Sequence, residues 1–112
     1  LDGVTAIKLK MSKSGGPQAL ANQVVLCRSL GLKVVVGNGV ASDLGCFHEA
    51  VCYGQLGLDT AAEMNGFLKI TDSLLDTPLS MNQGSLELPN PRTVAVDQER
   101  LASLAIDTRE FS

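Results

Sequence analysis

The sequence predicts an α/β fold built on a parallel sheet. Three short runs of strand-like composition alternate along residues 4–64 with two longer segments of helical periodicity, and this alternation is typical of βαβ units. The chain has 112 residues, of which 45% are hydrophobic and 19% charged, as in globular domains. A complete (β/α)8 barrel needs about 250 residues. The chain therefore suffices for somewhat less than half a barrel, and an open, doubly wound sheet is the alternative.

The first strand is predicted at residues 4–10, where apolar and polar residues alternate. Because strand side chains point alternately to opposite faces, Lys8 and Lys10 share one face, and Ile7 and Leu9 share the other. Two neighbouring ammonium groups disfavour each other's charge, which suits a lysine for proton transfer. The alternative is an edge strand whose lysines guard against aggregation.

A helix and a second strand follow. Pro17 suits the first turn of a helix, and Gly31 suits its end. Residues 32–36 form a short β-branched run, as expected for a buried parallel strand. The apolar residues of the helix that recur at helical spacing are Leu20, Val24 and Cys27.

The second helix and the third strand occupy residues 42–64. Ser42 can cap this helix, which ends at Gly54 or Gly57. A third short strand is predicted at residues 60–64. The apolar stripe predicted for the helix consists of Leu44, Phe47 and Val51.

The C-terminal part has a different pattern. Residues 79–81 and 85–88 indicate a small hairpin, and Asp97 begins a final helix that extends to about residue 106. We therefore expect two parts, residues 1–78 with the parallel strands and residues 79–112 with the hairpin and the terminal helix.

Composition narrows the function classes. The net charge of −3 argues against nucleic-acid binding, which needs a basic surface. No apolar stretch is long enough to span a membrane, and no signal-peptide pattern is present. Cys27, Cys46 and Cys52 are odd in number and lie in apolar helical contexts, so we expect reduced core thiols in a cytoplasmic protein. On a helix, His48 lies about 200° from Cys46, so the cysteines and the histidine are not expected to bind metal.

Polar residues with chemical potential follow the three predicted strands. They are Lys10, the Gly37–Gly39 turn, and Glu63 with Asn65. The carboxyl ends of parallel strands carry the working groups of such folds. The turn could instead bind an anion at a helix N-terminus, or simply need the positive φ that glycine and asparagine tolerate. Glu63 could contact substrate, or it could close the strand and pair with Lys69 or Lys10.

At these positions the chain resembles the enolase superfamily, in its mandelate racemase and muconate-lactonizing enzyme branch. Residues 7–17 are similar to the sixth-strand motif, 36–45 to the seventh-strand segment and 62–69 to the eighth. Residues 84–89, followed by the helix at Asp97, resemble the segment that returns to the capping domain. The resemblance implies a partial, TIM-type (β/α)8 barrel comprising the last three parallel strands and their helices, plus the hairpin and helix.

The resemblance also implies a reaction. In the lysine-using members, a lysine five positions before the first glycine of the Gly-Gly pair is an acid/base group, and Lys10 holds that position here. The family abstracts a proton α to a carboxylate while Mg²⁺ stabilises the enediolate, giving epimerases, cycloisomerases or dehydratases, which are isomerases or lyases. The implied Mg²⁺ ligands belong to earlier strands. The implied substrate-binding residues are Asn38, Gly39, Ser42, Glu63 and Asn65.

Two departures restrict the reaction. Ala41 replaces an acidic group that many cycloisomerases carry, and Gly39 falls where mandelate-type racemases have a histidine. We expect the chain alone, which starts at Leu1 without a methionine, to be a fragment, a processed product or a truncated form. Its partners would be the missing N-terminal barrel half and capping domain, with a small carboxylate as substrate. The alternative function is a non-catalytic partial barrel that self-associates through its open edges or binds an anion at Gly37–Gly39.

Overall fold

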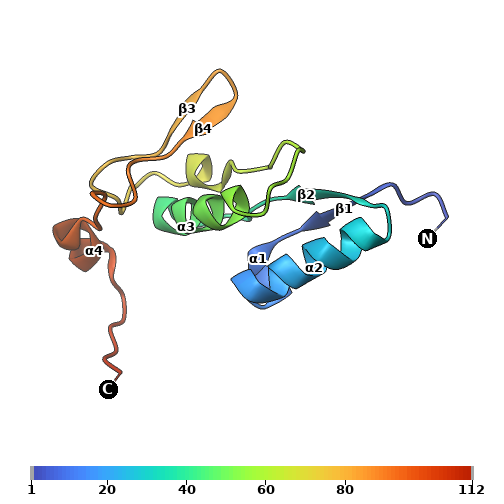
Figure 1. Cartoon of the computed structure of the whole chain (residues 1–112). Coiled ribbons are helices and arrows are strands. Elements are labelled where there is room, and N and C mark those ends of the chain that lie inside the picture. Colours follow the sequence, from blue (N-terminus) through green and yellow to red (C-terminus); the bar gives the residue numbers. More distant parts are fainter. Residues whose placement is uncertain (1, 112) are drawn as a thin grey trace.

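The computed structural model describes residues 2–111, so Leu1 and Ser112, which end the two expected parts, lie outside the described residues. None of the described helices combines the length and apolar character that crossing a bilayer requires. Figure 1 shows the arrangement of the chain. The elements, in chain order, are β1 (Ala6–Leu9), α1 (Met11–Ser14), α2 (Pro17–Ser29), β2 (Lys33–Val36), α3 (Asp43–Gly54), the 3-10 helix η1 (Gly66–Lys69), β3 (Ser80–Asn82), β4 (Ser85–Glu87) and α4 (Gln98–Leu104).

The parallel pairing predicted from the sequence is confirmed for the first two strands. β1 and β2 run parallel, in a register that pairs Ala6 with Lys33 and Leu9 with Val36. The connection between them contains α2, which lies alongside both strands (Figure 1). The helix buries Leu20, Val24 and Cys27, as its spacing predicts, and packs them in one cluster with Val34 and Val36 of β2.

The third predicted strand is reduced to one parallel bridge, between Gly37 and Glu63. The N–H of Glu63 donates to the Val36 carbonyl at 2.9 Å, and the N–H of Asn38 donates to the Glu63 carbonyl at 3.0 Å. One step earlier, the hydroxyl of Thr60 donates to the Val34 carbonyl. A side chain thus uses the acceptor that a backbone N–H would need for the ladder to continue, and the strand prediction for residues 60–64 is wrong in extent.

Helix α3 buries a different face from the predicted one. Leu44 is exposed, and Phe47 and Val51 are only half-buried. The buried face is largely polar because its polar groups have partners on other segments. For example, the Tyr53 hydroxyl donates to the Gly37 carbonyl at 2.9 Å and accepts from the Met11 N–H at 3.1 Å. The buried residues of α3 are Asp43, Cys46, Glu49 and Tyr53.

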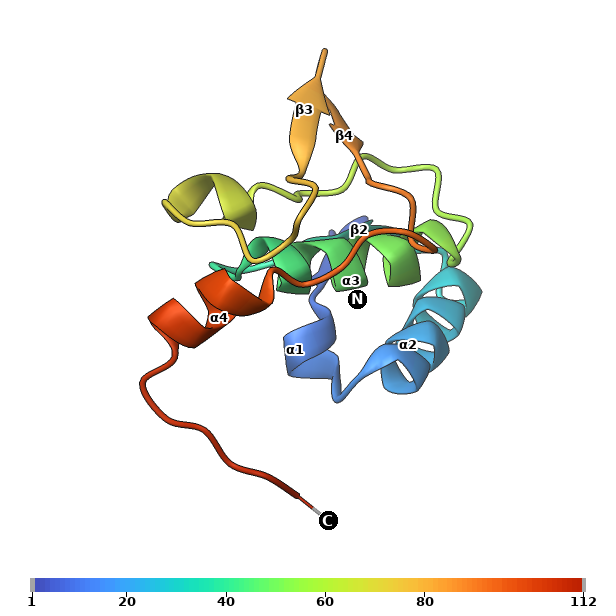
Figure 2. The ribbon, with the colours of Figure 1, turned by 90° about the vertical axis from the view of Figure 1, so that its left-hand side faces the viewer.

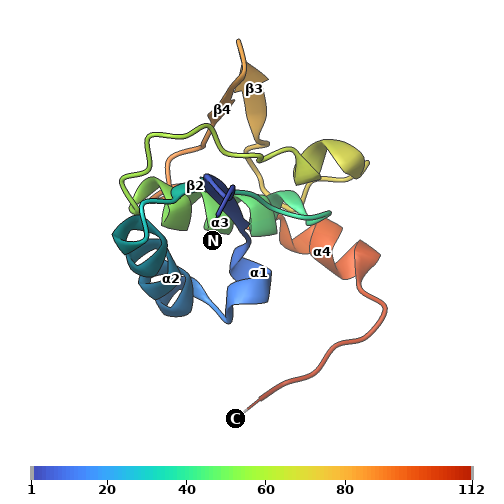
Figure 3. The same cartoon turned by 90° about the vertical axis from the view of Figure 1, so that its right-hand side faces the viewer.

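The hairpin and terminal helix are confirmed. β3 and β4 pair antiparallel, and Asp97 caps α4 by accepting from the Arg100 N–H at 3.0 Å. The helix ends at Leu104 rather than near residue 106. Figures 2 and 3 show that the hairpin projects to one side of α3, whereas α1 and α2 lie on the opposite side. The short helix α1, which the sequence did not predict, ends at Gly15 in the left-handed conformation with φ 95°.

Candidate functional site

The face of the sheet that points away from the core carries an ion pair. Lys8 of β1 and Glu63 form a salt bridge, with both side chains about half exposed. They meet over Gly37. A Cβ built at this glycine would lie 3.0 Å from Lys8 Cε and 3.4 Å from Glu63 Cβ, so a larger residue would compete with the pair for the same space. Glu63 thus pairs with a lysine that the sequence interpretation did not choose.

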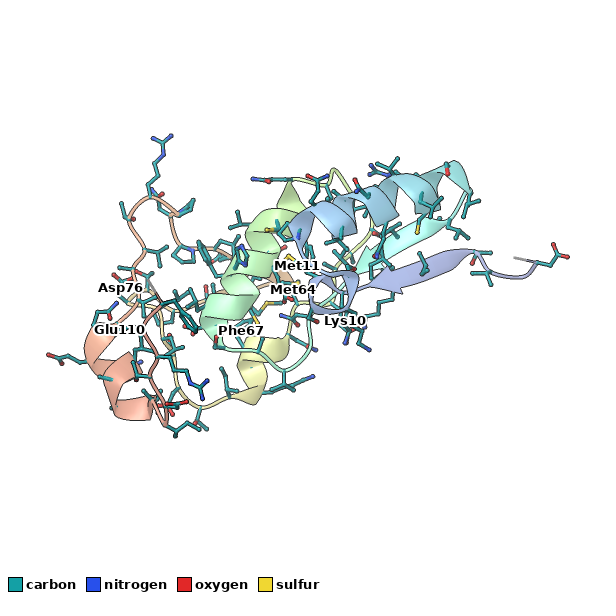
Figure 4. The ribbon with its side chains drawn as sticks, turned by 90° about the horizontal axis from the view of Figure 1, so that it is seen from below. Lys10, Met11, Met64, Phe67, Asp76 and Glu110 are labelled. Atoms are coloured by element: carbon teal, nitrogen blue, oxygen red, sulfur yellow. The ribbon has the colours of Figure 1, made fainter. Side chains whose placement is uncertain are left out.

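Lys10 stands at the carboxyl end of β1 on the same face as Lys8. Its φ of −131° and ψ of 131° are extended, so the strand alternation continues through it. Its carbonyl accepts from the Ser14 N–H at 3.0 Å and from the Ser14 hydroxyl at 2.9 Å. The start of α1 thereby fixes the backbone from which the half-buried lysine projects, while the neighbouring Met11 packs into the core together with Met64 (Figure 4).

Lys8 and Lys10 also line a cavity of about 280 Å³ along the free edge of β1, together with Gln23 of α2. Among the described residues, β1 has a hydrogen-bonded strand neighbour only in β2. The lysines therefore stand at the side of the sheet where another strand could be added.

Asn38 is buried, and both ends of its amide are engaged. Its Nδ2 donates to Cys46 Sγ at 2.8 Å, and its Oδ1 accepts from the Gly66 N–H at 3.2 Å. The side chain thus ties α3 to the loop that begins η1. This geometry favours a structural role for Asn38, in place of the substrate contact expected from the sequence.

Gly39 and Asn65 are brought together by the same contact. A Cβ at Gly66 would collide with the Gly39 carbonyl oxygen, so the two loops approach this closely only with glycine at residue 66. Asn65 leaves the extended conformation, and its carbonyl accepts from the Leu68 N–H at 3.1 Å. Both Gly39 and Asn65 are exposed.

The Gly37–Gly39 turn does not form an anion cradle in this structure. The N–H of Gly37 donates to the Leu9 carbonyl at 3.1 Å, and the N–H of Asn38 is taken by Glu63. Neither Gly37 nor Gly39 has a positive φ, so the turn also does not need glycine for that reason. The backbone donors continue the sheet instead.

Ser42 caps α3, as predicted, by accepting from the Gly45 N–H at 3.2 Å. It also lines a cavity of about 580 Å³ between residues 69–74 and α4. Lys10 does not line this cavity, so the predicted site residues do not all open to one hollow.

Asp43 is a buried polar residue whose long-range role the sequence interpretation missed. Its carboxylate accepts from the Leu74 N–H at 2.8 Å, the Leu75 N–H at 3.0 Å and the Ser73 hydroxyl. Burial acts to raise the pKa of Asp43, yet these hydrogen bonds together hold the pKa below its ordinary value. The carboxylate thus clamps residues 73–75 to the start of α3. The only sequence signal was an aspartate in the first turn of a helix.

The described residues do not supply a Mg²⁺ site. No three histidine, cysteine, aspartate or glutamate side chains within residues 2–111 converge in a way that could hold a metal ion. The donor set does not fit the metal that the resemblance implies, and no chemical step is assigned to it here.

A parallel α/β arrangement with a lysine at a strand's carboxyl end is shared with enzymes of the enolase superfamily, and comparison with solved structures confirms the resemblance found in the motifs. The muconate lactonizing enzyme of Klebsiella pneumoniae is similar with a TM-score of 0.78 and 25% identity, over 94% of this chain and 29% of that chain. The enzyme of the same name from "Mucobacterium Smegmatis" has a TM-score of 0.73 and 28% identity, over 88% of this chain and 29% of that one.

The L-Ala-D/L-Glu epimerase of Bacillus subtilis is similar in fold, with a TM-score of 0.66 and 17% identity, over 75% of this chain and 23% of that chain. This chain thus spans less than a third of the length of each of these enzymes. No family model matches the sequence, and no curated protein matches it.

Proposed function

We propose that this chain forms the last three strands and helices of an enolase-type barrel and supplies Lys10 as an acid/base group. The observation that carries the proposal is the position of Lys10, at the carboxyl end of β1, in a chain whose fold matches one end of muconate lactonizing enzymes. The neighbouring order of β1, β2 and the Glu63 bridge supports it.

The charges on this face suit proton transfer. Lys8 is neutralised by Glu63, whereas none of the ion pairs among the described residues includes Lys10. A lysine without a carboxylate partner is free to take or return a proton at a carbon next to a carboxylate, provided that the substrate lies within hydrogen-bond reach. Gly39 and Asn65, on exposed neighbouring loops, are the groups of this chain that we propose to contact the substrate.

The rest of the catalytic machinery would come from residues beyond this chain. The Mg²⁺ ligands and an opposing base belong to the earlier strands of the barrel. The proposed reaction is epimerisation, cycloisomerisation or dehydration of a small carboxylate, and the proposed partner is the N-terminal barrel half with its capping domain.

Reconstitution tests the proposal. The part of the K. pneumoniae enzyme that this chain does not match would be produced separately and mixed with this chain in deuterated buffer containing Mg²⁺. Exchange of the α-proton would be followed by NMR for muconolactone and for the dipeptide L-Ala-L-Glu. We expect the two parts to bind and to catalyse exchange, and Lys10→Ala to lower its rate at least about 100-fold.

Lys13→Ala is the matched control, because Lys13 is an exposed lysine on α1 only three residues away, and it should retain exchange. Parts that do not bind, a bound mixture without exchange, or exchange that survives Lys10→Ala would each overturn the proposal.

One observation favours the alternative of self-association. The free edge of β1 exposes apolar residues, and so does the flank of α2, where Leu26 is 58% and Leu30 55% exposed. If this surface joins two copies, sedimentation should show a dimer at micromolar concentration, and Leu26→Lys should return it to a monomer.

A further inference from the structure

Glu49 is a buried carboxylate that the proposed function does not use. It lies in the middle of α3 and is only 9% exposed. Its Oε2 atom is fully buried and has no hydrogen-bond partner in the described part of the chain. A buried carboxylate oxygen without a donor is costly. Burial raises the pKa of Glu49, although the nearby charges of His48 and Lys10 act in the opposite direction.

Glu49 lines a cavity of about 400 Å³ between the turn that joins α1 to α2 and the first half of α3. Figure 2 shows these segments facing each other. Small residues keep the space open on both sides. Gly15 and Gly16 have φ values of 95° and 114°, where a side chain would be strained. On α3, Ala41 and Gly45 lie one helical turn apart and also line the cavity.

The chemistry of the lining selects the ligand. Apart from Glu49, the polar side chains in the lining are Ser12 and His48, and the remainder is apolar or backbone, including Met11 and Pro17. One carboxylate and one imidazole are too few protein ligands for a tightly held divalent metal ion. A carboxylate beside an apolar wall instead matches an organic cation that has N–H donors and a short aliphatic body.

We propose that this cavity binds a primary alkylammonium group, with the Glu49 carboxylate as its counterion. The ammonium donates to the buried Oε2 atom, and the alkyl chain packs against Met11 and Pro17. The site lies on the helical side of the sheet, so it is separate from the Lys10 face.

The proposal is tested with n-butylammonium chloride as the probe and this 112-residue chain as the protein. The thermal unfolding midpoint and the amide NMR signals of Gly15 and Gly16 would be measured during the titration. Sodium chloride and n-butanol at the same concentrations are the reference additives, because each supplies only one of the two features of the ligand. A ligand that binds only the folded state raises the midpoint progressively with its concentration.

We expect a saturable rise for the wild-type chain and at least tenfold weaker apparent affinity for Glu49→Gln. Glu99→Gln, which changes an exposed glutamate on α4, should respond as the wild type does. If Glu49→Gln alters the unfolding midpoint too much for comparison, the NMR titration still reports affinity. The proposal is overturned if wild-type shifts do not exceed those with the reference additives, or if Glu49→Gln binds the amine as tightly as the wild type.

Discussion

Asp43 joins α3 to a segment thirty residues further along the chain, and its replacement by asparagine should destabilise the fold substantially. Oδ1 accepts from the N–H groups of Leu44 and Leu74, and Oδ2 accepts from the Leu75 N–H and the Ser73 hydroxyl. In Asp43→Asn one oxygen becomes an NH₂ group, which cannot accept. The Ser73 hydroxyl still has the Leu75 carbonyl at 3.1 Å, but one backbone N–H loses its partner.

The magnitude follows from these contacts. An unpaired buried donor costs about 1–3 kcal/mol, and each remaining bond becomes weaker once its acceptor is neutral. The free energy of unfolding should therefore fall by about 2–4 kcal/mol at pH 7, as measured by urea denaturation. Asp59→Asn, at an exposed position, is the control and should change it by less than about 0.5 kcal/mol.

The effect should also depend on pH. Because folding holds the pKa of Asp43 below its ordinary value, the ionised carboxylate stabilises the fold above the unfolded pKa of about 4. This contribution is lost as the pH falls through the folded pKa. The difference between wild type and Asp43→Asn should accordingly shrink toward pH 3. A difference below about 0.5 kcal/mol at pH 7, or one that is the same at pH 3 and pH 7, would refute the reasoning.

Three further substitutions test the packing around the sheet. Because burial raises the pKa of Glu49, its ionisation opposes folding as the pH rises; Glu49→Gln should thus raise the unfolding midpoint at pH 8 and change it little near pH 4, and a loss of stability at pH 8 would contradict this. Gly37→Ala places a Cβ 3.0 Å from Lys8 Cε, so it should cost about 1–2 kcal/mol in urea denaturation and disturb the ion pair with Glu63; a neutral result would show that the pair does not depend on glycine. Tyr53→Phe removes a hydroxyl that joins two buried backbone groups and should cost about 1–3 kcal/mol, and an unchanged denaturation midpoint would argue against that bridge.

Local patterns predicted the elements whose partners are apolar. The spacing of Leu20, Val24 and Cys27 identified the buried face of α2, since those side chains need only a hydrophobic neighbour. The alternation through Lys8 and Lys10 likewise fixed which face of β1 each lysine takes.

The same method failed where long-range polar contacts decide the outcome. On α3 the buried face includes Asp43 and Tyr53, which sequence periodicity assigns to the surface, because their partners are backbone groups of distant segments. The third strand was overestimated because the hydroxyl of Thr60, rather than a backbone N–H, bonds to β2. The burial of Asn38 and the pairing of Glu63 with Lys8 were equally invisible to local patterns.

The central claim is that the face of β1 bearing Lys10 becomes the interior of a barrel when the missing strands are added. A crystal structure of this chain bound to the complementary part of the K. pneumoniae enzyme and a carboxylate ligand tests it most directly. We predict that a parallel strand pairs with the free edge of β1 and that the Lys10 Nζ atom faces the ligand. A free edge covered by a helix, or a Lys10 side chain pointing to the outer surface, would contradict the account.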